Sequence, residues 1–302
     1  MSSPQESLPT TVEQFIRHGA RRLADANVWF GHGSDNAFDE AAELVFFGAG
    51  LRHEDAPGVY SRQLSQRQRD DVMQLFERRC RERVPAAYLT HRMWFAGHEF
   101  YVDERVLVPR SPIAELIEAR FEPWVEAERV HTVLDIGTGS GCIAIATALA
   151  FPEASVDAAD ISEDALAVAR INVERHGLSG RVRPVRSDVF GALAGRRYDV
   201  IVANPPYVGS EEMAGLPQEY LREPRLGLYG GDDGLDVVRT ILGQAHAHLQ
   251  PGGILITEVG NTEEALVDAF PQVPFTWLEF DRGGGGVFLL TAQELAPLAR
   301  SP

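Results

Sequence analysis

"TVLDIGTGSGCIAIA", residues 132–146, joins a short apolar run to a glycine-rich turn and then to a second apolar segment. Gly137, Gly139 and Gly141 permit a tight turn and a close approach of a ligand to the backbone, and a helix that begins after them presents free amides. A dinucleotide site of the pattern G-x-G-x-x-G requires glycine where Cys142 stands. The stretch therefore predicts a ligand-binding strand, turn and helix with the spacing D-x-G-x-G-x-G.

The segments from about Val130 onward alternate between strand and helix patterns, which predicts a largely parallel sheet covered on both faces. Only "DRGGG" separates the last two predicted strands, too short for a helical crossover, so they should pair antiparallel. The predicted fold class is α/β: a doubly wound seven-stranded sheet with an antiparallel last strand pair, plus a small helical N-terminal domain. The predicted strands are 132–136, 155–160, 182–188, 199–204, 253–259, 275–280 and 286–291.

The chain changes character near residue 90. Before this point apolar residues recur at helical spacing, whereas residues 93–108 alternate as in a hairpin, which Pro109 should end. Ser111 and Pro112 resemble the cap and first position of a helix. The predicted parts are a helical domain over 1–90, a hairpin and hinge over 91–120, and an α/β domain over 121–302.

Composition narrows the classes of function. The net charge of -16 argues against non-specific binding to nucleic acid and is compatible with a basic partner, or with solubility alone. Cys80 and Cys142 make neither a disulfide framework nor a metal cluster, which fits a reducing compartment. No apolar run reaches the ~18 residues that span a bilayer, and the N-terminus lacks a signal-peptide pattern, so we expect a cytoplasmic protein without membrane contact. The arginines predicted to line a solvated helix face are Arg78, Arg79, Arg81 and Arg83.

Polar side chains stand at the ends of four successive predicted strands of the sheet. Asp135, Asp160 and Asp188 are joined there by Asn204, and with the glycine turn they should line one crevice. A carboxylate such as Asp160 can accept both hydroxyls of a ribose, although any one of these acids could instead cap a helix. The apolar residues directly after two of these acids, suited to sandwich an adenine ring, are Ile161 and Val189.

Together "DIGTGSG", "ADIS", "SDVF" and "NPPY" resemble the class I methyltransferases that use S-adenosylmethionine, and "NPPY" resembles those members that methylate a planar amide or amine nitrogen. The resemblance implies that Asp160 holds the ribose and that Asp188 with Val189 meets the adenine. It implies that Asp135 orients the turn or approaches the methionine amino group, and it implies no metal. The turn that would flank the methionine portion comprises Gly137, Thr138, Gly139, Ser140 and Gly141.

The acceptor in such a reaction is a poor nucleophile, because a nitrogen conjugated to a carbonyl has a delocalised lone pair. Asn204 through its side-chain oxygen, and Pro205 through its backbone carbonyl, are suited to accept hydrogen bonds from both N–H groups of that nitrogen. Pro205 and Pro206 would hold this geometry because their φ angles are locked, and Tyr207 could stack on the flat acceptor. No strong general base is then obligatory. The alternative is that "NPPY" only terminates a strand.

The segments that flank these motifs narrow the choice of methyl acceptor. "VLVPR" at 106–110, "NPPYV" at 204–208 and "EPRLGLYGGDDGL" at 223–235 resemble the protein-(glutamine-N5) methyltransferase family over nearly the full length. Within it, "SPIAE" at 111–115, in place of the "PRPDTE" typical of the release-factor branch, and "PFTWLEFDRGGGGVFLLT" resemble the branch that methylates ribosomal protein L3. The resemblance implies methyl transfer from S-adenosylmethionine to a glutamine side-chain nitrogen of that basic protein. Residues 1–90 are expected to recognise this protein substrate.

Three alternatives remain at this stage. A release-factor glutamine methyltransferase shares the chemistry, and an adenine-N6 nucleic-acid methyltransferase shares the slot but usually needs a basic surface. A dehydrogenase or a non-catalytic nucleotide-binding module would bind NAD, and Cys142 together with "NPPY" argues against it. The segment after the slot, residues 210–224, is interpreted either as an acidic lid or as a solvated loop.

Overall fold

The computed structural model describes residues 9–298. The described chain forms two compact units. The first runs up to Arg92 and includes Pro217–Arg222, and the second comprises Met93–Leu216 and the chain from Glu223 onward. The chain therefore leaves the second unit after Leu216 and re-enters it at Glu223. Within residues 9–298, no helix has the length and apolar character that a membrane crossing requires.

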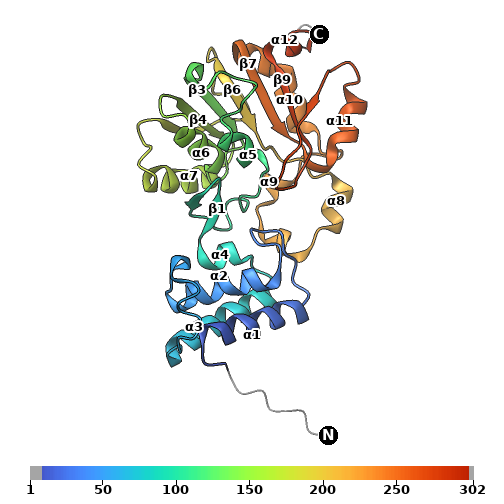
Figure 1. Cartoon of the computed structure of the whole chain (residues 1–302). Coiled ribbons are helices and arrows are strands. Elements are labelled where there is room, and N and C mark those ends of the chain that lie inside the picture. The colour runs from blue at the N-terminus through green and yellow to red at the C-terminus, as the bar shows by residue number, and fades with distance from the viewer. Residues whose placement is uncertain (1–8, 299–302) are drawn as a thin grey trace. The chain divides into compact units, whose positions relative to one another are not determined.

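The first unit packs amphipathic helices around an apolar core, with α2 in contact with both α1 and α3 (Figure 1). Thr11 begins α1 with a capping box, in which the side chains of Thr11 and Gln14 each accept a hydrogen bond from the other residue's backbone amide. Ser65 and Gln68 do the same for α3. The elements are α1 (Val12–Asp25), α2 (Ala37–Ala49), a 3-10 turn (His53–Asp55), α3 (Gln66–Glu77), a π-helical turn (Arg78–Glu82), α4 (Ala86–Thr90) and a 3-10 helix (Gln218–Arg222).

The arginines of the π-helical turn do not share one environment. Arg79 is completely buried, and its guanidinium lies 2.7 Å from Glu40 and 3.1 Å from Glu219. Arg78 and Arg81 instead form exposed ion pairs with acids four residues away. The prediction of a solvated face was wrong for Arg79, because Glu219, 140 residues away in sequence, supplies a buried counter-charge that helical periodicity cannot reveal.

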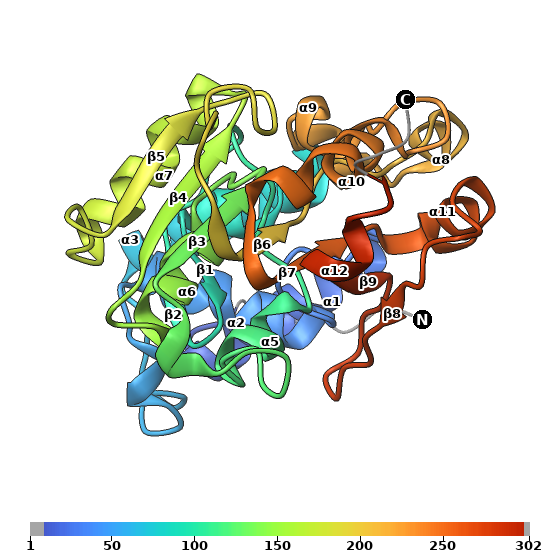
Figure 2. The same ribbon diagram turned by 90° about the horizontal axis from the view of Figure 1, so that it is seen from above.

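In residues 93–298, seven strands form one sheet in the order β5-β4-β3-β6-β7-β9-β8 (Figure 2). The strands from β5 to β7 are parallel, and β9 is antiparallel to both β7 and β8. This confirms the prediction of a doubly wound sheet with an antiparallel last pair, together with a set of N-terminal helices. The strands are β3 (Thr132–Ile136), β4 (Ser155–Asp160), β5 (Val182–Arg186), β6 (Tyr198–Ala203), β7 (Leu249–Glu258), β8 (Thr276–Trp277) and β9 (Val287–Thr291).

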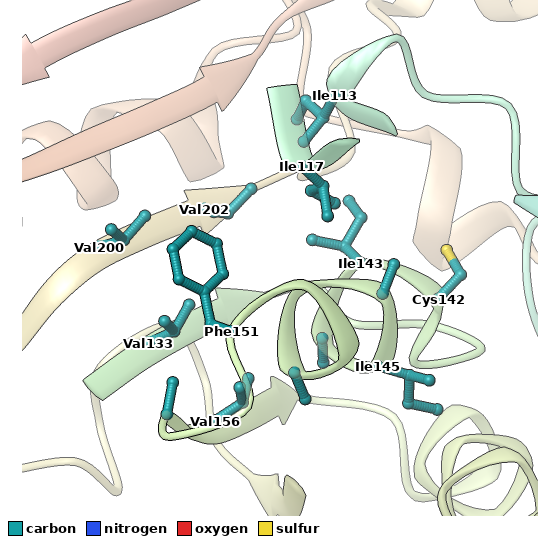
Figure 3. Close-up of a cluster of buried hydrophobic side chains, with 14 of the residues drawn as sticks. Ile113, Ile117, Val133, Cys142, Ile143, Ile145, Phe151, Val156, Val200 and Val202 are labelled. Carbon is teal, nitrogen blue, oxygen red and sulfur yellow. The ribbon is translucent and has the colours of Figure 1, made fainter. Parts of the chain in front are cut away.

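Helices cover both faces of this sheet because successive strand residues point to opposite sides. On β6, Val200 and Val202 pack toward α5 (Ile113–Glu118) and α6 (Cys142–Ala150), as Figure 3 shows. Ile201 and Ala203 pack toward α10 (Asp236–His248) on the other face. Both faces of β6 are therefore apolar, and the polar Asn204 follows directly after the strand ends. The helices are α5 (Ile113–Glu118), a 3-10 turn (Ala127–Arg129), α6 (Cys142–Ala150), α7 (Glu163–Arg175), α8 (Ser210–Gly215), α9 (Arg225–Leu228), α10 (Asp236–His248), a 3-10 turn (Gly260–Thr262), α11 (Glu263–Ala269) and α12 (Ala292–Leu295).

The hairpin is shorter than predicted. β1 (Met93–Phe95) pairs antiparallel with β2 (His98–Phe100), and the strand does not continue to Val108. The reason is that side chains take over the hydrogen bonds of the following backbone: Asn172 bonds both the amide and the carbonyl of Tyr101, and Glu223 accepts from the amide of Val108. The following helix α5 begins one residue later than predicted, because Pro112 is its N-cap and not its first residue. The Ser111 hydroxyl accepts a hydrogen bond from the amide of Ile113.

Candidate active site

The glycine turn follows β3 and leads into α6. Gly137, Gly139 and Gly141 have φ angles of 73°, 53° and 80°, the left-handed region that strains other residues. The amides of Gly137 and Thr138 both donate to the carbonyl of Ala159 at the end of β4, at 2.9 and 3.0 Å. A β-carbon on Gly139 would meet only the oxygen of Gly137, at 4.0 Å, so the turn is open on that side.

Asp135 lies beneath this turn and is completely buried. Its Oδ2 accepts from the hydroxyl of Thr138 at 2.5 Å and from the amide of Ala144, in the first turn of α6, at 3.1 Å. Burial raises the pKa of Asp135 to about 7, against the effect of these two donors. Its Oδ1 has no hydrogen-bond partner among the described residues. The carboxyl thus holds the turn through one oxygen, while the other is buried and unpartnered within the described part of the chain.

Asp160 ends β4 and binds the glycine turn from the other side. Its Oδ2 accepts from the amide of Gly139 at 2.9 Å, and its Oδ1 accepts from the amide of Ser162 at 2.8 Å. The cap of α7 is Ser162, whose hydroxyl accepts from the amide of Ala165. Burial raises the pKa of Asp160, opposed by the backbone amides. Each carboxylate oxygen keeps a further lone pair, so the pair can still accept two hydroxyls.

The residues expected around an adenine ring lie in different environments. Ile161 is 47% exposed, whereas Val189 is buried with a φ of 45°. Asp188 is exposed and lies two residues beyond the end of β5, so the prediction that it closes this strand was wrong. The backbone there turns early, because the buried Ser187 hydroxyl donates to the carbonyl of Val189 at 2.8 Å. Ser187 was not predicted, and a single serine gives no signal for this role.

The residues predicted to form the acceptor slot begin where β6 ends. Ala203, the last residue of β6, pairs with Ile136 of β3, which places Asn204 next to the glycine turn. A β-carbon on Gly137 would lie 3.3 Å from the backbone oxygen of Asn204 and 3.7 Å from Cα of Pro205. Pro205 is buried, whereas Asn204, Pro206 and Tyr207 are half-buried. The structure therefore brings the predicted cofactor turn and the predicted acceptor residues together.

Glycines of the "LYGGDDGL" segment pack closely against the backbone of Pro206 and Tyr207. A β-carbon on Gly230 would lie 2.5 Å from the backbone oxygen of Pro206, and one on Gly234 would lie 2.2 Å from that of Tyr207. The backbones of Val208 and Gly230 are joined by a 3.0 Å hydrogen bond. These glycines were quoted in the sequence as part of a motif but not as site residues. Their role follows from close backbone packing, which the turn-rich composition alone does not specify.

Glu258 is a further residue of the site that the sequence reasoning missed. It ends β7, is 6% exposed, and accepts from the hydroxyl of Tyr207 at 3.0 Å and from that of Ser111 at 2.5 Å. Burial raises its pKa, while Ser111, Tyr207 and the charge of Arg110 oppose the rise. An acid at the end of an apolar strand was the signal that identified Asp160, and the same signal was present here.

Arg110 holds two loops of the second unit together. Its two terminal nitrogens bind the two carboxylate oxygens of buried Glu223 at 2.6 and 2.8 Å. Glu223 lies in the segment interpreted as a lid or a solvated loop, and Glu219 of the same segment is buried in the first unit. Two acids near the end of that segment are therefore buried, whereas Leu221 between them and Glu211 of α8 are exposed.

The hydrogen-bond acceptors of the site fit S-adenosylmethionine. The carboxylate of Asp160 suits ribose hydroxyls, and the unpartnered Oδ1 of Asp135 is an acceptor for which a cationic amino group is a suitable donor. A β-carbon on Gly139 would meet only one atom within 4 Å. Among residues 9–298, no three His, Cys, Asp or Glu side chains gather in a way that could hold a metal ion.

Comparison with known proteins shows which family the chain resembles. Residues 122–224 match the family described as Methyltransferase small domain. A ribosomal protein uL3 glutamine methyltransferase of Xanthomonas campestris pv. campestris is 50% identical over 94% of this chain and 92% of its own length. Proteins of the same name from Burkholderia pseudomallei and Neisseria meningitidis serogroup B are 48% and 47% identical, over 96% and 95% of this chain and 97% and 94% of theirs.

Among solved structures, a methyltransferase from Pyrococcus furiosus is similar with a TM-score of 0.46 and 20% identity, over 64% of this chain and 88% of that one. The identity to the three glutamine methyltransferases extends over both units of the chain. The chain belongs to the ribosomal protein uL3 glutamine methyltransferase family.

Proposed function

We propose that this protein transfers a methyl group from S-adenosylmethionine to the side-chain amide nitrogen of a glutamine in ribosomal protein uL3, the L3 protein of the large subunit. The observation that supports the proposal is the close approach of Gly137 to Asn204, since a β-carbon on Gly137 would lie 3.3 Å from the backbone oxygen of Asn204. The turn that would hold the cofactor and the residues that would bind the amide meet there. The names of relatives that are 47–50% identical to the chain support the choice of uL3.

The residues of the turn would hold the cofactor, which supplies a methyl group on a positively charged sulfur. Asp160 would bind the ribose hydroxyls, and Asp135 would face the methionine amino group through Oδ1. Asp188, Ile161 and Val189 would surround the adenine. The turn itself, which would flank the methionine portion, comprises Gly137, Thr138, Gly139, Ser140 and Gly141.

The slot would activate and orient the acceptor. The side-chain oxygen of Asn204 and the carbonyl of Pro205 would accept the two N–H groups of the glutamine amide, which raises electron density on its nitrogen. Pro205 and Pro206 restrict the backbone, and the Tyr207 ring would pack on the flat amide. Holding both reactants in line can supply about 7 to 11 kcal/mol of the barrier. In this transfer the nitrogen–carbon bond would form as the sulfur–carbon bond of the donor breaks, and the strongly acidic methylated amide would then release one proton.

The remaining assignments concern the binding partner, the roles of the domains and the cellular location. A net charge of -16 is complementary to a basic ribosomal protein and unfavourable for direct nucleic-acid contact. We assign recognition of the protein substrate to the helical domain, residues 1–90, and methyl transfer to residues 121–302, with the hairpin and hinge at 91–120 between them. The reaction would take place in the cytoplasm, without a membrane partner.

Mass spectrometry tests the substrate. Purified uL3 and release factors are each incubated with the protein and isotopically labelled S-adenosylmethionine, and the modified peptides are sequenced. We expect one labelled methyl group on a glutamine of uL3. Methylation of a release factor alone would replace uL3 as the substrate, and tight binding of NAD without binding of S-adenosylmethionine would overturn the methyltransferase assignment altogether.

A further inference from the structure

Glu258 is an ionisable side chain at the end of a mostly apolar strand. Residues 253–258 of β7 are all buried, and this run ends on the Glu258 carboxylate. Burying an acid is costly unless hydrogen bonds compensate. β7 lies beside β6, with Thr257 opposite Ala203, so Glu258 stands at the level of Asn204. An acid is therefore kept at the strand end that borders the acceptor slot.

The two hydroxyls bound to Glu258 come from segments far apart in the sequence. A carboxylate only accepts hydrogen bonds, so Tyr207 and Ser111 must both donate their protons to it. The Ser111 oxygen also accepts from the amide of Ile113, which ties the carboxylate to the first turn of α5. The Tyr207 ring has little freedom, because a β-carbon on Gly260 would lie 2.5 Å from its Cε2.

We propose that Glu258 is a positioning residue for methyl transfer: its carboxylate, anchored by Ser111, fixes the Tyr207 ring at the acceptor slot. The proposal rests on the proposed function, in which that ring packs on the glutamine amide. Glu258 acts through Tyr207 and needs no contact with the cofactor. Its loss should therefore lower kcat while leaving the affinity for S-adenosylmethionine unchanged.

Glu258→Gln tests this with little change in shape. The amide has one acceptor oxygen in place of two, so it cannot accept from both hydroxyls as the carboxylate does. Tyr207→Phe keeps the ring and removes its hydrogen bond to Glu258. Glu264→Gln makes the same chemical change at an exposed position of α11 and serves as the matched control.

The kinetic measurement is kcat and KM for uL3, with the Kd for S-adenosylmethionine from calorimetry. We expect Glu258→Gln to lower kcat roughly 10- to 100-fold, with the Kd within about twofold of wild type. The double variant with Tyr207→Phe should be no slower than the slower single variant, because both changes break one interaction. Additive losses, or wild-type kcat in Glu258→Gln, would overturn the proposal.

A second readout does not depend on the acceptor. In protein with labelled tyrosine, the NMR signal of the Tyr207 ring should shift in Glu258→Gln and stay unchanged in Glu264→Gln. An unchanged Tyr207 signal in Glu258→Gln would refute the positioning role. Failure of the wild-type protein to methylate uL3 would instead refute the proposed substrate, so the two failures are distinguishable.

Discussion

A β-carbon on Gly137 would lie 3.3 Å from the backbone oxygen of Asn204, so the glycine turn and the proposed acceptor slot meet where only a hydrogen atom fits comfortably. Gly137 also has a φ of 73°. The relative position of the two halves of the site therefore depends on one residue that lacks a side chain.

Gly137→Ala should disturb both halves together. The left-handed backbone costs an alanine roughly 1–2 kcal/mol, and the new methyl group must push the Asn204 backbone away. We expect a lower free energy of unfolding, weaker cofactor binding and slower methyl transfer, measured by denaturation, calorimetry and kinetics. Gly180→Ala, where a β-carbon meets nothing within 4 Å, is the control and should change none of the three.

Asn204→Ala should separate the chemistry from cofactor binding. It removes the side-chain oxygen assigned to the glutamine amide, and loss of one such oriented group costs about 100- to 1000-fold in kcat. The Kd for S-adenosylmethionine should stay close to wild type. Parallel loss of binding and transfer would show that Asn204 belongs to the cofactor site rather than to the acceptor slot.

Asp160→Ala should chiefly weaken cofactor binding. The change removes the proposed ribose acceptor and leaves the amide of Gly139 without its partner, so we expect a Kd about 10- to 100-fold higher. A cofactor analogue without ribose hydroxyls distinguishes the two effects. It should bind wild type more weakly than the natural cofactor does, but bind Asp160→Ala as well as the natural cofactor does. If wild type and Asp160→Ala favoured the natural cofactor over the analogue by the same factor, Asp160 would not bind the ribose.

Asp135 should make stability depend on pH. Its pKa is about 7 in the folded protein against an ordinary value of 3.8, so between these values the folded state holds a proton that the unfolded state has lost. This contribution to stability is fully present below about pH 4 and is lost as the pH rises through 7. The free energy of unfolding should fall by up to about 4 kcal/mol over this range.

Asp135→Asn removes this titration while its side-chain oxygen can still accept from Thr138 and Ala144. Its free energy of unfolding, minus that of wild type, should therefore rise from about pH 4 to pH 7 and level off above. Chemical denaturation at several pH values measures the difference. A difference that does not vary with pH would contradict the raised pKa.

The sequence by itself determined the strand framework and the glycines and polar residues at the strand ends. Residues 132–136 and 155–160 were predicted with the bounds that β3 and β4 have, because buried parallel strands are short apolar runs with turns at their ends. Left-handed glycines and polar residues at strand ends are local signals, so Gly137, Asp160 and Asn204 could be read from the chain alone.

Only the tertiary structure decided the interactions between distant segments. Ser111 and Glu258 are 147 residues apart, and Arg79 and Glu219 are 140 apart. The end of β2 likewise depends on Asn172, 71 residues from Tyr101. These pairings arise because a buried polar group must find a partner wherever the folded chain places one, and local sequence does not specify that partner.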